Sequence, residues 1–395
     1  MNKNITKRFS LVLSIFVIGT LLVGCGSKKQ TTSDLLKNSS KDSKVNIALV
    51  TDGKDEEGSL YDVAKTEVMQ FDYRKKNDDD FNGRFEHIVL PEQGGDNQLK
   101  IKKIFEGIKK NKDINVLVVS SKNKNLLNYI DDIKKQRKDI LTISSDMENK
   151  PIELSKTFDL NFGVSNIDRG KRIVQLSKSM GAEKVICFAS DNDLKNEANK
   201  KIYEQFLEES KKDDIDVILQ KIPSELTTYE KKAFVSNKID DIINEYGNNI
   251  DIYSFDGDLD EVLATKILKD KFYIAEFSNR NINKKLLEIY GITQIPRQMY
   301  NYVFENPQIG NIIESKYNIK RRMSSYGAEP KNFALEFSIE LGYTMKSKNI
   351  PIKKAYNSYF LEKVSFAKLG IESGFLNIKN NIGNYKIVDP DQIMY

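Results

Sequence analysis

VNIALVTD, residues 45–52, is the stretch that decides the fold we expect. It is a short apolar strand that ends in polar residues, and the next segment, Tyr61–Tyr73, carries apolar residues at helical spacing. This alternation of strand and helix continues along the chain as far as Phe272–Ala275. Strands separated by helices of this length build parallel sheets that are covered on both faces. The sequence therefore predicts an α/β protein with two doubly wound parallel-sheet (Rossmann-like) domains joined by a hinge.

The pattern gives approximate bounds for each element. The expected strands are Val45–Val50, His87–Leu90, Val116–Val119, Ile140–Ser144, Thr157–Val164, Lys184–Ala189, Ile215–Lys221, Ile250–Phe255 and Phe272–Ala275. The expected helices are Tyr61–Tyr73, Leu99–Lys110, Leu126–Arg137, Asp168–Met180, Leu194–Ser210, Thr228–Tyr246, Leu259–Lys269 and Asn332–Lys346. Gly181 is expected to end the helix that precedes it, because glycine adopts the left-handed conformation of a helix C-terminus without strain.

The N-terminus has the features of a secretory signal. Lys3, Lys7 and Arg8 precede an apolar run from Phe9 to Val23, which is short for a membrane-spanning helix. The run ends in Leu-Val-Gly-Cys25, which resembles a bacterial lipobox, whose cysteine receives diacylglycerol and becomes the first residue of the mature chain. A plain signal peptide, or an uncleaved anchor with an incidental cysteine, is the alternative.

Composition shifts divide the chain into five segments. We expect a lipoprotein signal peptide at 1–24, a flexible polar tether at 25–44, an N-terminal α/β domain at 45–165 and a C-terminal α/β domain at 166–295. Residues 296–395 lose the regular alternation and contain several prolines. We expect this last segment to cross between the two domains and brace both.

Composition also excludes several functions. Three of the five net positive charges lie in the first 24 residues, so the remaining chain carries only about +2 and has no basic stripe for nucleic acid. His87 is the only histidine, which argues against histidine zinc sites and Ser–His triads. No phosphate-binding loop or nucleophile elbow occurs. We therefore expect no enzyme activity, no cofactor and no metal. Cys187 lies in an apolar strand and is expected to be buried.

Polar residues follow almost every expected strand. In open α/β sheets, ligands bind beyond the carboxyl ends of the strands, at the point where the strand order reverses. Arg297 is added because a guanidinium can pair with a carboxylate or phosphate. The candidate ligand-binding residues are Thr51, Asp52, Ser120, Ser121, Ser144, Asp146, Ser190, Asp191, Asp256 and Arg297.

An alternative remains open for each of these residues taken singly. Ser, Asp and Asn before a helix are also ordinary N-caps, each worth about 1 kcal/mol to the helix that follows. Asp256-Gly257-Asp258 resembles the start of a calcium loop, but Glu261 stands where that loop needs glycine.

Tandem α/β blocks behind a lipobox resemble the type I periplasmic-binding-protein fold, and more narrowly an uncharacterised clostridial set of lipoproteins. The resemblance is carried by residues 45–52, by 115–121, and by Val164-Ser165-Asn166, Arg169-Gly170 and 179–185. It implies a lipid-anchored, extracytoplasmic solute-binding protein in which a small polar ligand enters a cleft that closes by hinge motion. It also implies a membrane anchor through Cys25 and an ABC-type importer as partner.

Two other roles share this fold. A surface sensor or assembly lipoprotein would have no transport role. An intracellular repressor would need a DNA-binding helix-turn-helix before the first strand, where this chain carries the signal and the tether.

Overall fold

The structure, a computed structural model, describes residues 43–54, 60–78, 81–92, 97–164, 168–292, 302–378 and 382–395. The side chains of 302–305 are not among what it describes. All of these residues belong to one unit, Lys41–Tyr395. The predicted signal peptide, Cys25 and nearly all of the predicted tether lie outside the described residues, as does Arg297.

A seven-stranded sheet (the large sheet) has the order β10-β11-β5-β4-β3-β1-β2. Its neighbouring strands are parallel except for the antiparallel pair β10 and β11. The strands are β1 (Val45–Thr51), β2 (Gly83–Val89), β3 (Val116–Ser120), β4 (Leu141–Ser145), β5 (Leu160–Val164), β10 (Ser373–Asn377) and β11 (Tyr385–Pro390). All residues of β1, β3 and β4 are buried, because helices cover both faces of a parallel sheet.

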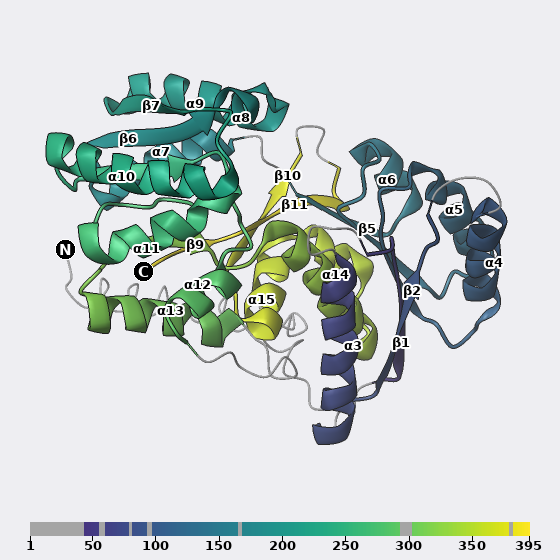
Figure 1. The fold of residues 1–395 in the computed structure, drawn as a ribbon. Helices are drawn as coiled ribbons and strands as arrows, with labels where there is room; N and C mark the ends of the chain where they lie inside the picture. Colours follow the sequence, from purple (N-terminus) through teal and green to yellow (C-terminus); the bar gives the residue numbers. More distant parts are fainter. Residues whose placement is uncertain are drawn as a thin grey trace, which may run out of the picture. The chain divides into compact units, whose positions relative to one another are not determined.

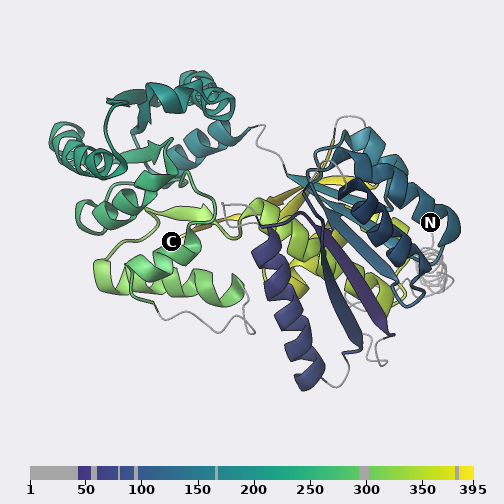
Figure 2. The same ribbon diagram turned by 45° about the vertical axis from the view of Figure 1, so that its right-hand side comes forward.

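Helices pack on both faces of the large sheet (Figures 1 and 2). One face carries α3 (Leu60–Asn77) and α14 (Pro330–Ser347), and α14 contacts five of the strands. The other face carries α4 (Asn97–Lys110), α5 (Leu127–Gln136) and α6 (Pro151–Thr157), which share one apolar cluster with β1 and β3.

A second, three-stranded sheet has the order β7-β6-β8 and is parallel throughout. Its strands are β6 (Lys184–Ser190), β7 (Asp216–Ile222) and β8 (Ile250–Ser254). Ile186 and Phe188 of β6 join the cluster of α10 (Thr228–Tyr246) and α11 (Asp260–Asp270). Cys187, as expected, is buried, and it joins the cluster of α7 (Arg169–Met180) and α9 (Glu197–Asp213) on the opposite face. Successive residues of a strand point to opposite faces, and this alternation produces the two clusters.

The remaining elements lie outside the strands of these two sheets. Tyr273 bridges Asp251 of β8, Ile274 bridges Met323, and β12 pairs with β9 in antiparallel fashion. The additional elements are η1 (Lys124–Leu126), α8 (Asp191–Lys195), η2 (Gly257–Leu259), α12 (Asn283–Ile289), α13 (Tyr302–Tyr317), β9 (Ser324–Tyr326), η4 (Ile352–Tyr356), α15 (Ser358–Leu369) and β12 (Gln392–Met394).

The α/β class is confirmed, and most expected elements are present. One predicted helix, 194–210, is wrong as a single element: it is divided at Asn196, whose side chain accepts from the N–H groups of Ala198 and Asn199 and so starts α9 afresh. The predicted strand Phe272–Ala275 appears as isolated bridges. Gly181 has φ +109° and ends α7, as expected. The division into domains at the predicted boundaries stays a prediction.

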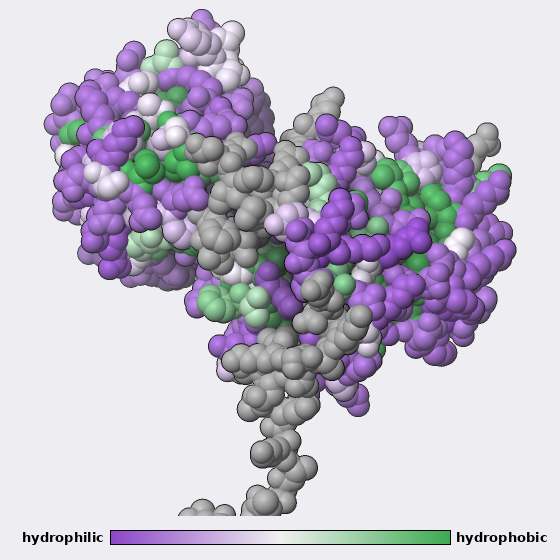
Figure 3. Space-filling view, turned by 90° about the horizontal axis from the view of Figure 1, so that it is seen from below, coloured by the Kyte–Doolittle hydropathy of each residue, from purple (hydrophilic) through white to green (hydrophobic). Residues whose placement is uncertain are grey.

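The described surface is largely polar. Figure 3 shows hydrophilic residues over most of the face it displays, in keeping with a mean hydropathy of −0.50. Among the described residues, no helix combines the length and the apolar content needed to cross a membrane.

Gly170 allows α7 to approach α9 closely. A Cβ at Gly170 would lie 2.4 Å from the carbonyl oxygen of Ile202 and 2.7 Å from the Cβ of Gln205. We expect Gly170→Ala to lower the free energy of unfolding by about 1–3 kcal/mol. Gly107→Ala, in α4, is the control: a Cβ there would have no atom within 4 Å, so this change should raise stability by about 0.5–1 kcal/mol. Urea unfolding followed by circular dichroism measures both, and equal effects would contradict the close packing.

Asp251 is fully buried at the junction of β8, α7 and the segment that follows α11. Its Oδ1 accepts from the Ala275 N–H at 2.7 Å, and its Oδ2 lies 2.7 Å from the Ser177 hydroxyl. That hydroxyl also lies within hydrogen-bond distance of the carbonyl oxygen of Ile173, so its single hydrogen serves one of two acceptors. Burial raises the pKa of Asp251 to about 7, although the hydrogen bonds from Ser177 and from the Ala275 N–H act in the opposite direction.

A pH dependence follows from the raised pKa. Between about pH 4 and 7 the folded chain keeps a proton on Asp251 that the unfolded chain releases, so stability falls as pH rises through this window. An asparagine amide can donate and accept like the protonated acid. Relative to wild type, Asp251→Asn should therefore be more stabilising at pH 8.5 than at pH 5, by roughly 2–4 kcal/mol. Unfolding of both proteins at the two pH values tests this, and a pH-independent difference would contradict it.

Candidate functional site

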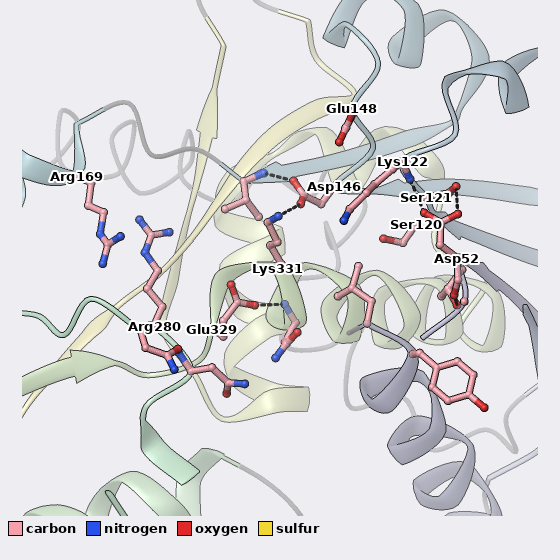
Figure 4. A pocket seen from close by; sticks show the side chains of 18 of the residues that line it. Asp52, Ser120, Ser121, Lys122, Asp146, Glu148, Arg169, Arg280, Glu329 and Lys331 are labelled. Atoms are coloured by element: carbon pink, nitrogen blue, oxygen red, sulfur yellow. Dashed lines mark hydrogen bonds and ion pairs between the residues drawn. The ribbon is translucent and has the colours of Figure 1, made fainter. Parts of the chain in front are cut away.

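A cavity of about 430 Å³ lies beyond the carboxyl ends of several strands of the large sheet (Figure 4). This volume is within the range of small-molecule sites. The residues that line it are Thr51, Asp52, Gly53, Leu60, Tyr61, Ser120, Ser121, Lys122, Asp146, Glu148, Val164, Arg169, Ser278, Asn279, Arg280, Asn281, Glu329, Lys331 and Asn332.

The order of the strands explains why polar side chains meet here. The chain passes from β1 to β2 on one side and then to β3 on the other side of β1. The carboxyl ends of β1 and β3 therefore flank the point where the strand order reverses, which is where such sheets bind ligands. Thr51 ends β1 and Ser120 ends β3, and both line the cavity.

Asp52 ties these two strand ends together. Its carboxylate accepts from the Ser121 hydroxyl at 2.6 Å and from the Lys122 N–H at 2.7 Å. Behind it, the Thr51 hydroxyl donates to the Asp52 carbonyl and lies 2.8 Å from His87 Nε2. These contacts fix the loop in place before any ligand arrives.

Ser120 differs from its neighbours because its hydroxyl is unused. The residue is 2% exposed, and its Oγ has no hydrogen-bond partner among the residues that the structure describes. A buried hydroxyl without a partner costs free energy, and an acceptor or donor on a bound molecule would remove that cost. Ser120 is therefore a residue of the cavity lining whose hydroxyl could still form a hydrogen bond.

Asp146 and Lys331 connect β4 to the start of α14. Asp146 has φ +45°, accepts from the Val164 N–H at 3.3 Å, and lies 3.7 Å from the Lys331 ammonium. Burial raises the pKa of Asp146 despite Lys331, which acts in the opposite direction. Glu329 caps α14 by accepting from the Asn332 N–H at 2.7 Å, and burial raises its pKa as well.

The far wall is built on a buried ion pair. Arg169 Nε donates to Glu276, and Arg169 Nη2 donates to the carbonyls of Phe277 and Ser278. Burial disfavours the charge on Arg169, yet Glu276 raises the pKa of Arg169 above its usual value. Gln392 Nε2 donates to the second oxygen of Glu276 at 2.7 Å. These bonds hold the segment after Ala275 against the cavity.

Asp260 supports the same segment from behind. Its two oxygens accept from the N–H groups of Ser278 and Asn279, at 3.2 and 2.7 Å. Burial raises the pKa of Asp260 to about 8. The backbone that carries Ser278, Asn279 and Arg280 into the cavity is therefore anchored on both sides.

The structure brings five of the predicted residues to the cavity: Thr51, Asp52, Ser120, Ser121 and Asp146. Ser144 instead donates to Asn161 inside the large sheet. Ser190 caps α8, Asp191 pairs with Lys221, and Asp256 caps η2 and pairs with Lys231. These four are not part of the cavity lining, and a ligand-binding role for any of the predicted residues stays a prediction.

Sequence reasoning did not propose Arg169, Arg280, Glu329 or Lys331 as site residues, although Arg169 was among the residues that carried the fold resemblance. The strand-end rule applied to Phe272–Ala275 points to the segment containing Arg280, so a signal for it existed. Glu329 and Lys331 begin a helix that follows no strand end of the alternating pattern, so the local sequence carries no such signal for them. Among the described residues, no cluster of three or more His, Cys, Asp or Glu is placed to hold a metal ion.

Solved structures share this architecture. The crystal structure of a candidate transcriptional regulator from Clostridium difficile 630 is 25% identical, and the match covers 90% of this chain and 100% of that chain with a TM-score of 0.75. A sugar ABC transporter from Actinomyces odontolyticus ATCC 17982 is 12% identical, with 89% and 95% of the two chains covered and a TM-score of 0.48. The second likeness is too distant to support any argument about function.

The α/β fold, with helices on both faces of a largely parallel sheet, is of the class that the sequence predicted. No curated protein matches the sequence. A family match spans residues 45–302, which is more than half of the chain. The chain therefore belongs to the family described as "Protein of unknown function (DUF3798)".

Proposed function

We propose that this protein is a lipid-anchored, extracytoplasmic solute-binding protein that holds a small polar ligand in the cavity and serves an ABC-type importer. The cavity at the switch point of the large sheet is the observation that carries this proposal. Its polar groups come from strand ends on one side and from residues 278–281 on the other, so a modest closing motion would surround a ligand. The proposed activity is binding, without chemical turnover.

The ligand is expected to stabilise the folded protein. A solute at about 100 times its dissociation constant adds about 2.7 kcal/mol, which corresponds to a shift of several degrees in Tm. The full-length protein, purified in mild detergent, is screened by thermal unfolding against sugars, sugar acids, amino acids, nucleosides, nucleotides, peptides and polyamines. Because the chain has no Trp, unfolding is followed by circular dichroism.

Ser120→Ala and Ser145→Ala form a matched pair for this test. Both hydroxyls are buried and have no hydrogen-bond partner within the described ranges, but of the two residues only Ser120 lines the cavity. Neither variant should lose stability in the absence of ligand. Ser120→Ala should weaken binding of the solute found in the screen by roughly 3- to 10-fold, the value of one hydrogen bond, while Ser145→Ala binds as wild type. If Ser120→Ala and Ser145→Ala bind the solute with equal affinity, the switch-point cavity is not the binding site. If no compound in the screen raises the Tm of the folded protein, the solute-binding function is wrong.

The anchor is tested by metabolic labelling in a bacterial host with an alkyne analogue of palmitate. Wild-type protein should be labelled, and Cys25→Ser should lose the label. Cys187→Ser is the control, because Cys187 is fully buried and should leave labelling intact. Label that persists in Cys25→Ser, or none in the wild type, would contradict lipidation at this residue.

The description of the C. difficile relative as a candidate transcriptional regulator supplies a second candidate function for this chain. A regulator that binds DNA acts in the cytoplasm, whereas lipidation at Cys25 requires export. An unlabelled wild-type protein that is recovered from the cytoplasm would therefore favour the regulator. A labelled protein with a silent ligand screen would favour the sensor or assembly role.

A further inference from the structure

Arg280 is a buried cation at the cavity whose hydrogen-bond donors are not all used. Its side chain is only 9% exposed, and both Nε and Nη2 are without a hydrogen-bond partner in the described part of the chain. The nearest carboxylate, Glu276, is 3.8 Å from Nε. A guanidinium has five N–H donors and no acceptor, so a buried one is stable only when oxygens surround it. The wall of the cavity thus presents a positive group that still needs acceptors.

Two neighbouring arginines have the partners that Arg280 lacks. Arg169 donates to Glu276 and to two carbonyls, as described above. Arg172 donates to both oxygens of Asp389 and to the Tyr326 hydroxyl at 2.7 Å. Each has a carboxylate of its own at hydrogen-bond distance, and Arg280 has none among the described residues.

The carboxylates near Arg280 are engaged elsewhere. Glu276 accepts from Arg169 through one oxygen and from Gln392 through the other. Glu329, on the same cavity, accepts from the N–H of Asn332 at the start of α14. Arg169 lies close enough to oppose the charge on Arg280, and burial and Arg169 together lower the pKa of Arg280. Among the described residues, Glu276 is thus an ion-pair partner of Arg280 at 3.8 Å, but no carboxylate accepts a hydrogen bond from Arg280 Nε or Nη2.

Figure 4 shows where a ligand would meet this charge. The Arg169 and Arg280 guanidiniums lie on one side of the cavity, and Asp52, Ser120 and Ser121 lie across from them. A planar guanidinium fork matches the two oxygens of a carboxylate or phosphate, and such paired, charge-assisted bonds are among the strongest in proteins. An oxyanion on Arg280 would leave the rest of the molecule facing the Ser120 hydroxyl.

We propose that the solute is an organic oxyanion, carrying a carboxylate or a phosphate, and that Arg280 binds this group. The inference rests on the proposed solute-binding function and narrows it to a class of ligand. The competing explanation is structural: the Arg280 guanidinium lies 4.8 Å from the centre of the Tyr326 ring and could serve only to pack there. A structural arginine would affect stability without ligand and would not discriminate between charged and neutral ligands.

The test compares molecules that differ only in the anionic group. Binding to the full-length protein is measured by calorimetry for galacturonate against galactose, amino acids against their amides, and nucleoside 5′-monophosphates against nucleosides. We expect the acidic member of the binding pair to be at least tenfold tighter. The pair that responds distinguishes carboxylate from phosphate. If a neutral or cationic solute binds as tightly as its acidic counterpart, the inference is wrong while the solute-binding function stands.

Two substitutions assign the preference to Arg280. Arg280→Gln should abolish the preference for the acidic member, and Arg280→Lys, which keeps the charge but not the fork, should retain part of it. Arg322→Gln is the control, because Arg322 packs 4.2 Å from the Tyr273 ring and does not line the cavity. An unchanged preference in folded Arg280→Lys and Arg280→Gln would overturn the assignment. If no solute of any charge binds to folded wild-type protein, the proposed function fails and the inference fails with it.

Discussion

Burial of the central parallel strands is the constraint on which the rest of this structure depends. Every residue of β1 is buried, and the same holds for β3 and β4. A strand covered by helices on both faces is largely apolar, and a polar side chain within it must find a partner inside the sheet, as Ser144 does with Asn161. Polar side chains that face open space can collect only where the strands end. The large sheet thereby determines both the layered fold and the position of the cavity.

A second requirement is that the segment after Ala275 be held against that sheet's open end. This is done by buried polar groups: Arg169 and Glu276 pair, Gln392 adds a bond to Glu276, and Asp260 accepts from two backbone N–H groups. Buried ion pairs contribute little net stability, because desolvation offsets much of their attraction, but loss of one partner is costly. In this structure, these buried polar bonds serve to position the segment after Ala275. They fix the backbone that carries Arg280, whose Nε and Nη2 have no hydrogen-bond partner among the described residues.

Local signals predicted much of the fold. The helix Thr228–Tyr246 was predicted with the bounds that the structure has, and in the structure Thr227 and Glu230 form a capping box at its start. The helix expected over 194–210 failed where Asn196 starts a new helix, a competing local signal that apolar spacing does not reveal. Phe272–Ala275 has the composition of a strand, but its pairing depends on Asp251 and Met323, which lie far from it in sequence.

The candidate site, like the fold, was predicted only in part from the sequence. The sequence alone was enough to identify which strand ends carry polar groups, because apolar periodicity marks where each strand stops and Thr51, Asp52 and Ser120 follow directly. It could not distinguish a helix cap from a cavity residue. Ser190 and Ser120 both end parallel strands. The Ser190 hydroxyl forms hydrogen bonds with Asp193, three residues further along. The Ser120 hydroxyl has no partner among the described residues, and Ser120 lines the cavity. That distinction required the folded chain, because a side chain's free hydrogen-bonding capacity depends on which distant segment, here that of Arg280 and Glu329, is brought opposite to it.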